Sequence, residues 1–295
     1  MKKEYYLEQF KQHLILNDKA SGTIEIYLSN INLFIKFYMD TFNEEFEPSD
    51  VIETDIQEFR NNMLNKQGLK ATTINNKLAA IKEYFSFLYE SKFITKNVAL
   101  KIKKIKLSSS TVPRSFTLKE FRTIKRIIYR NHSPLDILIL ELLSRTGCRI
   151  SELINIKIRD IDLKERSGKL NIIGKGLKAR SIPLPHTDLR DAISEYLKYR
   201  EKKNITSEYL LVSERQQPFT RSGLSKLLKK YEKPTGIKIH AHLFRSFFAI
   251  TLLKNPETNI HHVMRLLGHS SIESSAIYLK LHMEDLEKSV AEMNI

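Results

Sequence analysis

Two arginines beside apolar, helix-like stretches are the residues of this sequence best suited to bind phosphate oxygens. Arg149 follows a Thr-Gly turn and precedes the apolar ISELI, and Arg245 leads into the apolar SFFAITLL. A guanidinium stays charged, and its planar fork binds two oxygens at once. Cleaving a phosphodiester needs such charge around the non-bridging oxygens, a nucleophile, and an acid for the leaving oxygen. Taken alone, Arg149 is more typical of a salt bridge, with Glu152 as its obvious partner.

Histidines near these arginines could move protons. His242 precedes Arg245 by three residues, so the two side chains share one face of a helix. The spacing alone is not specific, because His262 and Arg265 repeat it. The first pair is favoured, because Arg245 runs into an apolar helix that would hold it rigidly.

Lys175 and Tyr278 complete the candidates, although neither is distinctive alone. Lys175 lies between two glycines at a predicted hairpin tip, where an exposed turn lysine is the simpler interpretation, and Lys178 and Arg180 are close rivals for its role. Tyr278 is one of 12 tyrosines. Its phenol, with an ordinary pKa of roughly 10, needs neighbouring cations to become a nucleophile.

The sequence argues against a metal centre and a nucleotide triphosphate site. His240, His242, His261 and His262 form a cluster in the sequence, but neither HExxH nor paired-cysteine spacing occurs. GKG at 174–176 lacks the P-loop pattern GxxxxGK(S/T). The one cysteine, Cys148, excludes an internal disulfide framework, and we expect it to be a small buried residue. We therefore expect no metal and no cofactor.

Four segments, in this order, resemble the motif boxes of the tyrosine recombinases, the phage-integrase family. They are TGCRISEL, GKGLKAR, HLFRSFFA and LLGHSSIESSAIY. The resemblance is closest to Xer-like and transposon-resolving members. Two earlier segments, SGTIEIYLSNINLFIKF and ATTINNKLAAIKEYFSFL, resemble the family's helical core-binding domain.

The resemblance implies roles for the residues that match the boxes. Arg149 and Arg245 would clamp the scissile phosphate, and Lys175 would protonate the leaving 5′ oxygen. Tyr278 would attack the phosphorus and form a 3′-phosphotyrosyl link. Cations around one tyrosine would stabilise both a phenolate and a pentacoordinate phosphorane.

Three further positions match the family, whereas Phe244, Ser246 and Cys148 depart from its usual residues. His242 would assist proton transfer at the nucleophile, and His269 would donate a hydrogen bond to a non-bridging oxygen. Glu152 matches an acidic position that supports the first box. Ser246 stands where many relatives have histidine, which removes one possible phosphate or structural contact.

The function that the resemblance implies is site-specific recombination of duplex DNA through a four-way junction, without metal or ATP. The partner would be double-stranded DNA with an inverted-repeat core site, bound by a homotetramer in synapsis, alone or with a homologous recombinase. Integration, excision and resolution of DNA elements or of chromosome and plasmid dimers remain open. So do two alternatives, a type IB topoisomerase-like nicking-closing enzyme and a DNA-binding accessory protein; an RNA binder is a weaker one.

The charge of the chain also points to a polyanion. Lys and Arg number 49 against 34 Asp and Glu, a net charge of +15 over 295 residues. Residues 1–110 hold 16 basic and 14 acidic residues, a net of +2, so residues 111–295 carry the remaining +13. The acidic stretch Asp40–Glu58 should face away from DNA. No run of about 18 apolar residues occurs, so we expect no membrane partner and a cytoplasmic protein.

A basic, Ser-rich segment at Lys101–Arg114 predicts a linker between two domains. We expect a helical, SAM-like core-binding domain at 1–104, a linker at 105–115, and a catalytic domain with a C-terminal tail helix at 116–295. The fold class is mainly α with a small β-sheet. The candidates for DNA contact are Lys77, Lys82, Lys103, Lys104, Lys178 and Arg180.

Local patterns predict the elements of the first domain. Apolar residues at helical spacing run from Ile24 to Tyr38 and from Ile74 to Leu88. Thr72 or Thr73 is the expected N-cap of the second of these helices. The polar face of that helix carries Lys77 and Lys82, where DNA contact and a solvated surface are equally consistent.

The second domain carries stronger end signals. Thr117 with Glu120 has capping-box spacing, Ser133 and Pro134 begin an apolar helix, and Gly147 ends it.

Residues 169–184 read as a β-hairpin. A helix stops at Gly268, Ser270 with Glu273 has capping-box spacing, and the tail after Tyr278 reads as one amphipathic helix.

Overall fold

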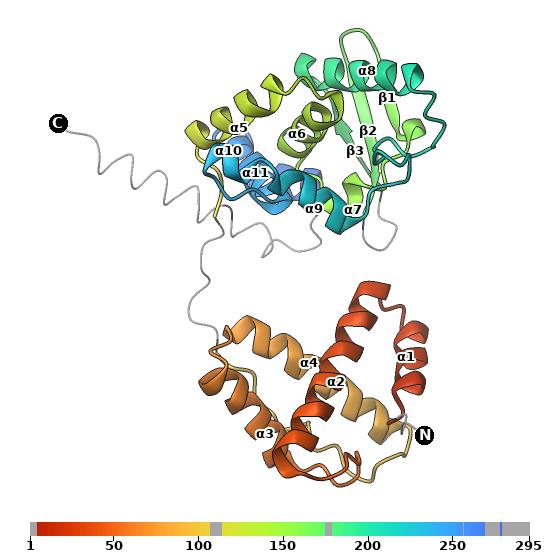
Figure 1. The fold of residues 1–295 in the computed structure, drawn as a ribbon, viewed down its shortest axis with the longest axis vertical. Coiled ribbons are helices and arrows are strands. Elements are labelled where there is room, and N and C mark those ends of the chain that lie inside the picture. The colour runs from red at the N-terminus through yellow and green to blue at the C-terminus, as the bar shows by residue number, and fades with distance from the viewer. Residues whose placement is uncertain (1–4, 107–113, 175–178, 256, 269–277, 279–295) are drawn as a thin grey trace, which may run out of the picture. The chain divides into compact units, whose positions relative to one another are not determined.

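The computed structural model describes residues 5–106, 114–174, 179–255, 257–268 and 278. Its contacts divide the chain into two compact units, residues 1–111 and 112–295 (Figure 1). The predicted fold class is confirmed, because the described ranges consist of helices and one three-stranded sheet. None of the helices in these ranges has both the length and the apolar character needed to cross a bilayer.

Helices build the described part of the first unit. The two predicted helices are present as α2 and α4, but α4 begins after Lys70, earlier than Thr72 or Thr73. The predicted cap was therefore wrong, since both threonines lie inside the first helical turn. The elements are α1 (Leu7–Leu16), α2 (Ser21–Phe42), α3 (Glu53–Asn61), a π-helical turn (Asn62–Lys66) and α4 (Ala71–Glu90).

Aromatic side chains fill the core of this unit. The rings of Phe34 and Phe59 meet edge-on with centroids 5.3 Å apart, and so do those of Phe10 and Tyr84. Such pairs add about 0.5–1.5 kcal/mol each beyond the burial of their area. The buried hydroxyl of Tyr84 donates to the carbonyl of Tyr5 at 2.6 Å, which satisfies its polar atom.

The chain after α4 folds back along that helix. Asn75 binds both backbone groups of Ile105, accepting from its N–H at 2.8 Å and donating to its carbonyl at 2.9 Å. Lys82 donates to the carbonyl of Leu100 at 3.3 Å. Residues 100–105 therefore run antiparallel to α4, from Lys82 toward Asn75.

The second unit surrounds the apolar helix α6, which packs against α5, α8 and α11 (Figure 1). The described elements are α5 (Leu118–Arg130), α6 (Pro134–Thr146), α7 (Ile150–Leu153), a 3₁₀ turn (Ile158–Asp160), β1 (Ile161–Leu163), β2 (Gly168–Ile173), β3 (Ala179–Pro183), α8 (Thr187–Lys202), α9 (Arg221–Lys229), α10 (Glu232–Thr235), α11 (Ala241–Leu253) and α12 (Ile260–Leu267).

The predicted helix ends of this unit are confirmed wherever the structure describes them. Thr117 and Glu120 form the capping box of α5. Ser133 caps α6 ahead of Pro134, and Gly147 ends it in the left-handed conformation. The helix α12 likewise ends at a left-handed glycine, Gly268. The proposed capping box at 270–273 and the tail helix lie outside the described residues.

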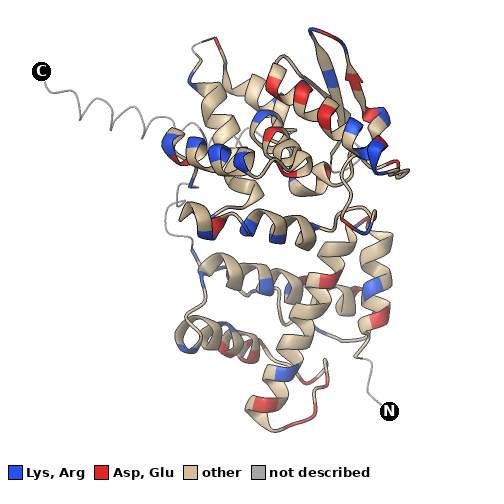
Figure 2. Cartoon of the chain, turned by 45° about the horizontal axis from the view of Figure 1, so that its top comes forward, with Lys and Arg blue, Asp and Glu red and all other residues tan. Residues whose placement is uncertain are grey.

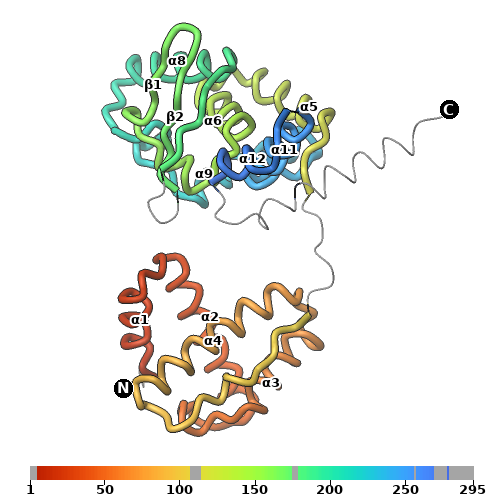
Figure 3. The backbone as a smooth tube through the Cα atoms, turned by 180° about the vertical axis from the view of Figure 1, so that it is seen from behind, coloured from red at the N-terminus to blue at the C-terminus, as the bar shows by residue number. Residues whose placement is uncertain are grey.

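The predicted hairpin is present as β2 and β3, with Leu170 opposite Ile182. The strand β1 was not predicted; it pairs antiparallel with β2 and places Ile161 opposite Leu170. Three residues at a sheet edge are too few to show an alternating pattern. Figure 3 shows the sheet from behind, where β1 and β2 lie beside α8.

Gly147→Ala should destabilise the second unit more than Gly236→Ala. Both glycines end helices, with φ of 60° and 68°, and an added Cβ costs about 1–2 kcal/mol in that conformation. At Gly147 the Cβ would also lie 2.5 Å from Phe248 Cδ1, whereas at Gly236 nothing lies within 4 Å. We expect an additional loss of about 1–3 kcal/mol at Gly147.

Urea unfolding followed by far-ultraviolet circular dichroism measures both variants against the unmodified chain. Equal losses in the free energy of unfolding would show that the close packing at Gly147 contributes nothing.

Candidate active site

The turn between α6 and α7 positions Arg149. The left-handed Gly147 reverses the chain, and Arg149 then becomes the residue that begins α7. Its backbone N–H and its Nη1 donate to the two carboxylate oxygens of Glu152, at 2.8 and 2.9 Å. The Arg149 side chain remains 38% exposed. One end of the guanidinium is therefore anchored, while the other faces outward.

Arg245 comes from α11 and is buried, with 3% of its surface exposed. It joins two other elements, since Nη1 donates to the carbonyl of Gly147 at 2.7 Å and Nη2 to that of Leu267 at 2.8 Å. Burial, and then the positive charge of Arg149, lower the pKa of Arg245 to about 10. The guanidinium is therefore still charged at neutral pH.

Glu152 is the carboxylate that Arg149 shares with Arg180. Arg180, on β3, donates through Nη1 and Nη2 to the two oxygens of Glu152 at 3.0 and 2.8 Å. Burial would raise the pKa of Glu152, but the hydrogen bonds from Arg180 and Arg149 outweigh it and hold the pKa at about 2. Glu152 thus stays ionised and fixes the orientation of both arginines.

Three arginines meet at the carboxyl end of α12. Arg180 Nε donates to the carbonyl of Leu266 at 2.8 Å, and Arg245 Nη2 donates to that of Leu267. Arg149 makes longer bonds of 3.4 Å to Leu267 and Gly268. The last carbonyls of a helix have no intrahelical partner and carry its negative dipole end, so cations are favoured here.

Tyr278 lies in the same region. Its side chain is 2% exposed and belongs to an apolar cluster with Phe248, Val263 and Leu267. It is close enough to Arg245 to act on it electrostatically, raising the pKa of the guanidinium. The phenol of Tyr278 therefore lies buried beside the buried guanidinium of Arg245.

His242 lies in the first turn of α11 and is exposed, three residues before the buried Arg245. Partial desolvation lowers the pKa of His242 below 6.5, and the charge of Arg245 lowers it further. The imidazole is therefore mainly neutral at pH 7 and can accept a proton. The other pair of this spacing, His262 and Arg265, is exposed on α12.

Cys148 lies in the turn between α6 and α7. It is 1% exposed, as predicted, and its Sγ lies 2.7 Å from Thr146 Oγ1. Burial raises the pKa of its thiol to about 11. A protonated, buried thiol of this kind fills space beside the arginines.

Comparison with known proteins identifies this arrangement. Residues 114–285 match the phage integrase family, and residues 6–94 match the phage integrase N-terminal SAM-like domain. The chain belongs to the phage integrase family. The predictions of a tyrosine recombinase and of Xer-like relatives are thereby confirmed, and the topoisomerase-like and accessory alternatives are not favoured.

Relatives of this family match almost end to end. A tyrosine recombinase XerA of Pyrococcus horikoshii is 32% identical over 98% of this chain and 93% of its own. A tyrosine recombinase XerC of Pediococcus pentosaceus is 28% identical over 95% and 94%. The solved structure of the XerH site-specific recombinase bound to palindromic difH is similar in fold, with a TM-score of 0.74, 22% identity, and coverage of 92% and 80%.

The structure brings four of the six predicted catalytic residues of this family member to one region: Arg149 and Arg245 at the end of α12, with His242 and Tyr278 beside Arg245. Lys175, Lys178 and His269 lie outside the described residues. His269 directly follows Gly268, whose carbonyl Arg149 binds.

Arg180 has a position that the sequence analysis did not anticipate. It was a candidate for DNA contact, yet its side chain is 9% exposed and its guanidinium is bonded to Glu152 and Leu266. No local pattern could show this, because its partners lie 28 and 86 residues away. Inside the site, Arg180 fixes Glu152 and the end of α12.

The other described candidates for DNA contact lie in the first unit of the chain. Lys77 donates to Asn30 Oδ1 at 3.3 Å, and Lys82 to the carbonyl of Leu100. Lys103 and Lys104 are exposed on the segment that runs along α4. These four lysines therefore lie near one another.

A basic helix, α9, packs against α7 and was not singled out from the sequence. Leu224 and Leu228 are buried, while Arg221, Lys226 and Lys229 are exposed. The sequence pattern that could have predicted this helix is a row of leucines at helical spacing with basic residues on the opposite face. Figure 2 shows Lys and Arg on several helices of the second unit.

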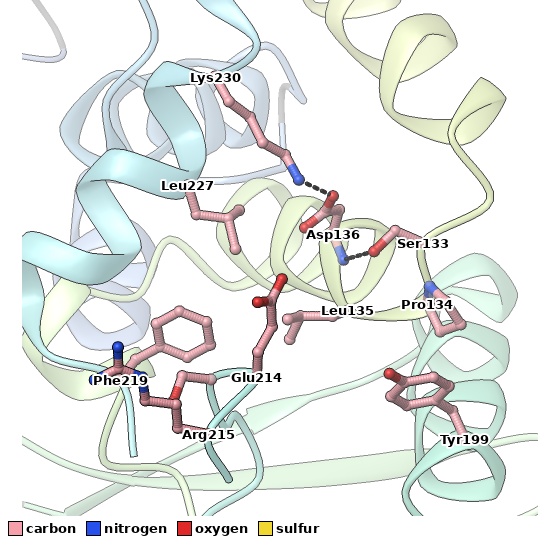
Figure 4. A pocket seen from close by; sticks show the side chains of 11 residues that line it. Ser133, Pro134, Leu135, Asp136, Tyr199, Glu214, Arg215, Phe219, Leu227 and Lys230 are labelled. Carbon is pink, nitrogen blue, oxygen red and sulfur yellow. Dashed lines mark hydrogen bonds and ion pairs between the residues drawn. The ribbon is translucent and has the colours of Figure 1, made fainter. Parts of the chain in front are cut away.

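A separate pocket of this unit contains none of the predicted site residues (Figure 4). It lies between the start of α6, Tyr199 of α8 and the loop at Glu214. Its buried acid, Asp136, accepts from Lys230 at 2.6 Å and from Tyr231 at 2.5 Å, so its charge is compensated. Among the described residues no group of three His, Cys, Asp or Glu side chains could hold a metal.

Glu152→Gln should remove a pH-dependent part of the stability. The ionised Glu152 stabilises the fold above pH 4.5, where the carboxyl is ionised in the unfolded chain too, and this contribution is lost as pH falls toward about 2. The shift from 4.5 to about 2 corresponds to roughly 3 kcal/mol. The difference in unfolding free energy between the two proteins should therefore shrink between pH 7 and pH 3.

Urea unfolding at each pH measures this difference, with Glu201→Gln, at an exposed residue, as the control. A difference that stays constant across the pH range would contradict the assignment of a low pKa to Glu152.

Proposed function

We propose that this chain cleaves and rejoins duplex DNA at a specific site, with Tyr278 as the nucleophile. The observation that carries the proposal is the meeting of Tyr278 and two arginines at the carboxyl end of α12. A phosphate bound there would face positive charge and a phenol together. The relatives named tyrosine recombinases support this chemistry.

The two arginines would divide the binding of the scissile phosphate. Arg149 is partly exposed, and its bonds to Leu267 and Gly268 are long, so a phosphate oxygen can replace them at small cost. Arg245 is buried beside the positive charge of Arg149, so a phosphate bound between them would reduce the repulsion between the two cations. Glu152 and Arg180 would hold this geometry while the phosphate reacts.

The proposed transfer balances without ATP or a metal ion. The Tyr278 oxygen forms a bond to phosphorus as the bond from phosphorus to the 5′ oxygen breaks. The phenol proton passes to the neutral His242, and Lys175 gives a proton to the 5′ oxygen. His269 would donate a hydrogen bond to a non-bridging oxygen. A 5′ hydroxyl of another strand then reverses these steps and releases Tyr278.

Both parts of the chain would hold the DNA. We propose residues 1–104 as a core-binding domain, 105–115 as a linker and 116–295 as the catalytic domain. Phosphate contacts would come from the exposed face of α9 and from the lysines near α4. Sequence-independent contacts of this kind position the duplex. The candidates are Lys77, Lys82, Lys103, Lys104 and Lys178.

The assembly we propose is a homotetramer on two inverted-repeat core sites, with or without a homologous recombinase. A lambda integrase tetramer bound to a Holliday junction, similar in fold with a TM-score of 0.70 and 18% identity, supports the arrangement. Exchange of one strand pair and then the other would pass through such a junction.

Tyr278→Phe should abolish covalent attachment to DNA but retain DNA binding, because only the attacking oxygen is removed. The substrate is a nicked suicide duplex taken from the DNA flanking the gene's own element, incubated in EDTA and denatured. A protein–DNA adduct on a gel reports cleavage, and a gel shift reports binding.

Tyr199→Phe is the matched control, because that tyrosine lies on α8 at 37% exposure. Its adduct should equal that of the unmodified chain. An adduct formed by the Tyr278→Phe variant would refute the assignment of the nucleophile.

A further inference from the structure

Helix α5 carries an exposed row of four basic residues. Lys119, Arg122, Arg126 and Arg130 follow one another at spacings of three, four and four residues, so they share one face of the helix. All four are exposed. We call this row the α5 stripe. None of its members belongs to the elements that form the active site.

The acidic residue of the same helix is already engaged. Glu120 is the acidic residue of α5, and its Oε2 accepts from the backbone of Thr117 at 2.8 Å. Its Oε1 accepts from Arg114 at 2.7 Å. The carboxylate of Glu120 is therefore bound to Thr117 and Arg114, and does not neutralise the cations of the α5 stripe.

A fifth cation of the same helix shows the contrast. Lys125 points to another face, where it pairs with Glu141 at 3.1 Å and with Asp188 at 2.8 Å. Among the described side chains, those of the four stripe residues form no comparable ion pair. The charges of the stripe are thus available to a ligand, whereas Lys125 is used inside the fold.

The other face of α5 limits what that ligand can be. Ile124 and Ile128 are buried in the core of the second unit, at 0% and 1% exposure. The helix therefore cannot turn an apolar face into a bilayer, as a membrane-bound amphipathic helix does. A ligand must be recognised by the cations alone, which favours a polyanion with regularly repeated charge.

The dimensions of the stripe fit a nucleic acid strand. Its two ends, Lys119 and Arg130, are eleven positions apart in the sequence, which corresponds to about 16 Å along the helix. A DNA strand carries one phosphate per about 3.4 Å of axis, so the stripe spans about five phosphates. A shallow groove beside it is lined by Leu118, Lys119, Arg122, Thr123 and Arg126.

We propose that the α5 stripe is a second phosphate-binding surface that holds duplex DNA outside the segment bound at the active site. The proposal rests on the proposed function for the identity of the polyanion. Contact with phosphates alone would add affinity for any sequence and would make that affinity depend steeply on salt.

The test compares two double variants with equal loss of charge. Arg122→Gln with Arg126→Gln removes the centre of the stripe. Lys202→Gln with Lys203→Gln removes two exposed cations at the end of α8. Binding of a 40-bp duplex of unrelated sequence is measured by fluorescence anisotropy between about 0.05 and 0.3 M salt.

Loss of two phosphate contacts should make the negative slope of log affinity against log salt shallower by about 2, which weakens binding by tens of fold near 0.1 M. The α8 variant should keep the slope of the unmodified chain. An unchanged slope in the stripe variant, or an equal fall in both variants, would overturn the proposal.

Adduct formation on the suicide duplex, at saturating protein, separates this proposal from the proposed function. An adduct with an unchanged slope in the stripe variant would sustain Tyr278 chemistry and reject the surface. A shallower slope in that variant, with no adduct from the unmodified chain on the suicide duplex, would sustain the surface and reject the proposed function.

Discussion

The carboxyl end of α12 is the point on which the described site depends. Its last carbonyls accept hydrogen bonds from three arginines that the chain supplies from the start of α7, from β3 and from α11. A helix end needs partners for these oxygens and favours positive charge beside them. One helix terminus thereby joins segments more than 100 residues apart in the sequence.

This arrangement concentrates positive charge at one place in the fold. The guanidinium groups of Arg149 and Arg180 bind one carboxylate, Glu152, whereas that of Arg245 binds backbone carbonyls. The pKa of Arg245 is lowered because this cation is buried and lies next to a second cation, Arg149. A site of this kind is organised before an anion arrives, so little rearrangement is needed when charge develops on a phosphate.

The sequence predicted those features whose signals are local. The caps at Thr117, Ser133 and Gly147 follow from residues within one turn, and the four motif segments identified the family. The position of Arg180 depends on partners far along the chain, and β1 is defined by its pairing with β2, so neither could be read from a window. Thr72 and Thr73 show a further limit, since both are good capping residues and yet the N-cap of α4 is Lys70, two and three residues earlier.

The turn that carries Arg149 also contains the chain's one cysteine. Cys148 is buried and protonated at neutral pH, so a thiol reagent reaches it as a reactive thiolate only when the turn between α6 and α7 opens. Because Arg149 and Arg245 are both anchored at this turn, its opening takes the arginine cluster apart. The rate at which Cys148 is labelled therefore reports how often the arginine cluster opens. No engineered cysteine is needed for this measurement.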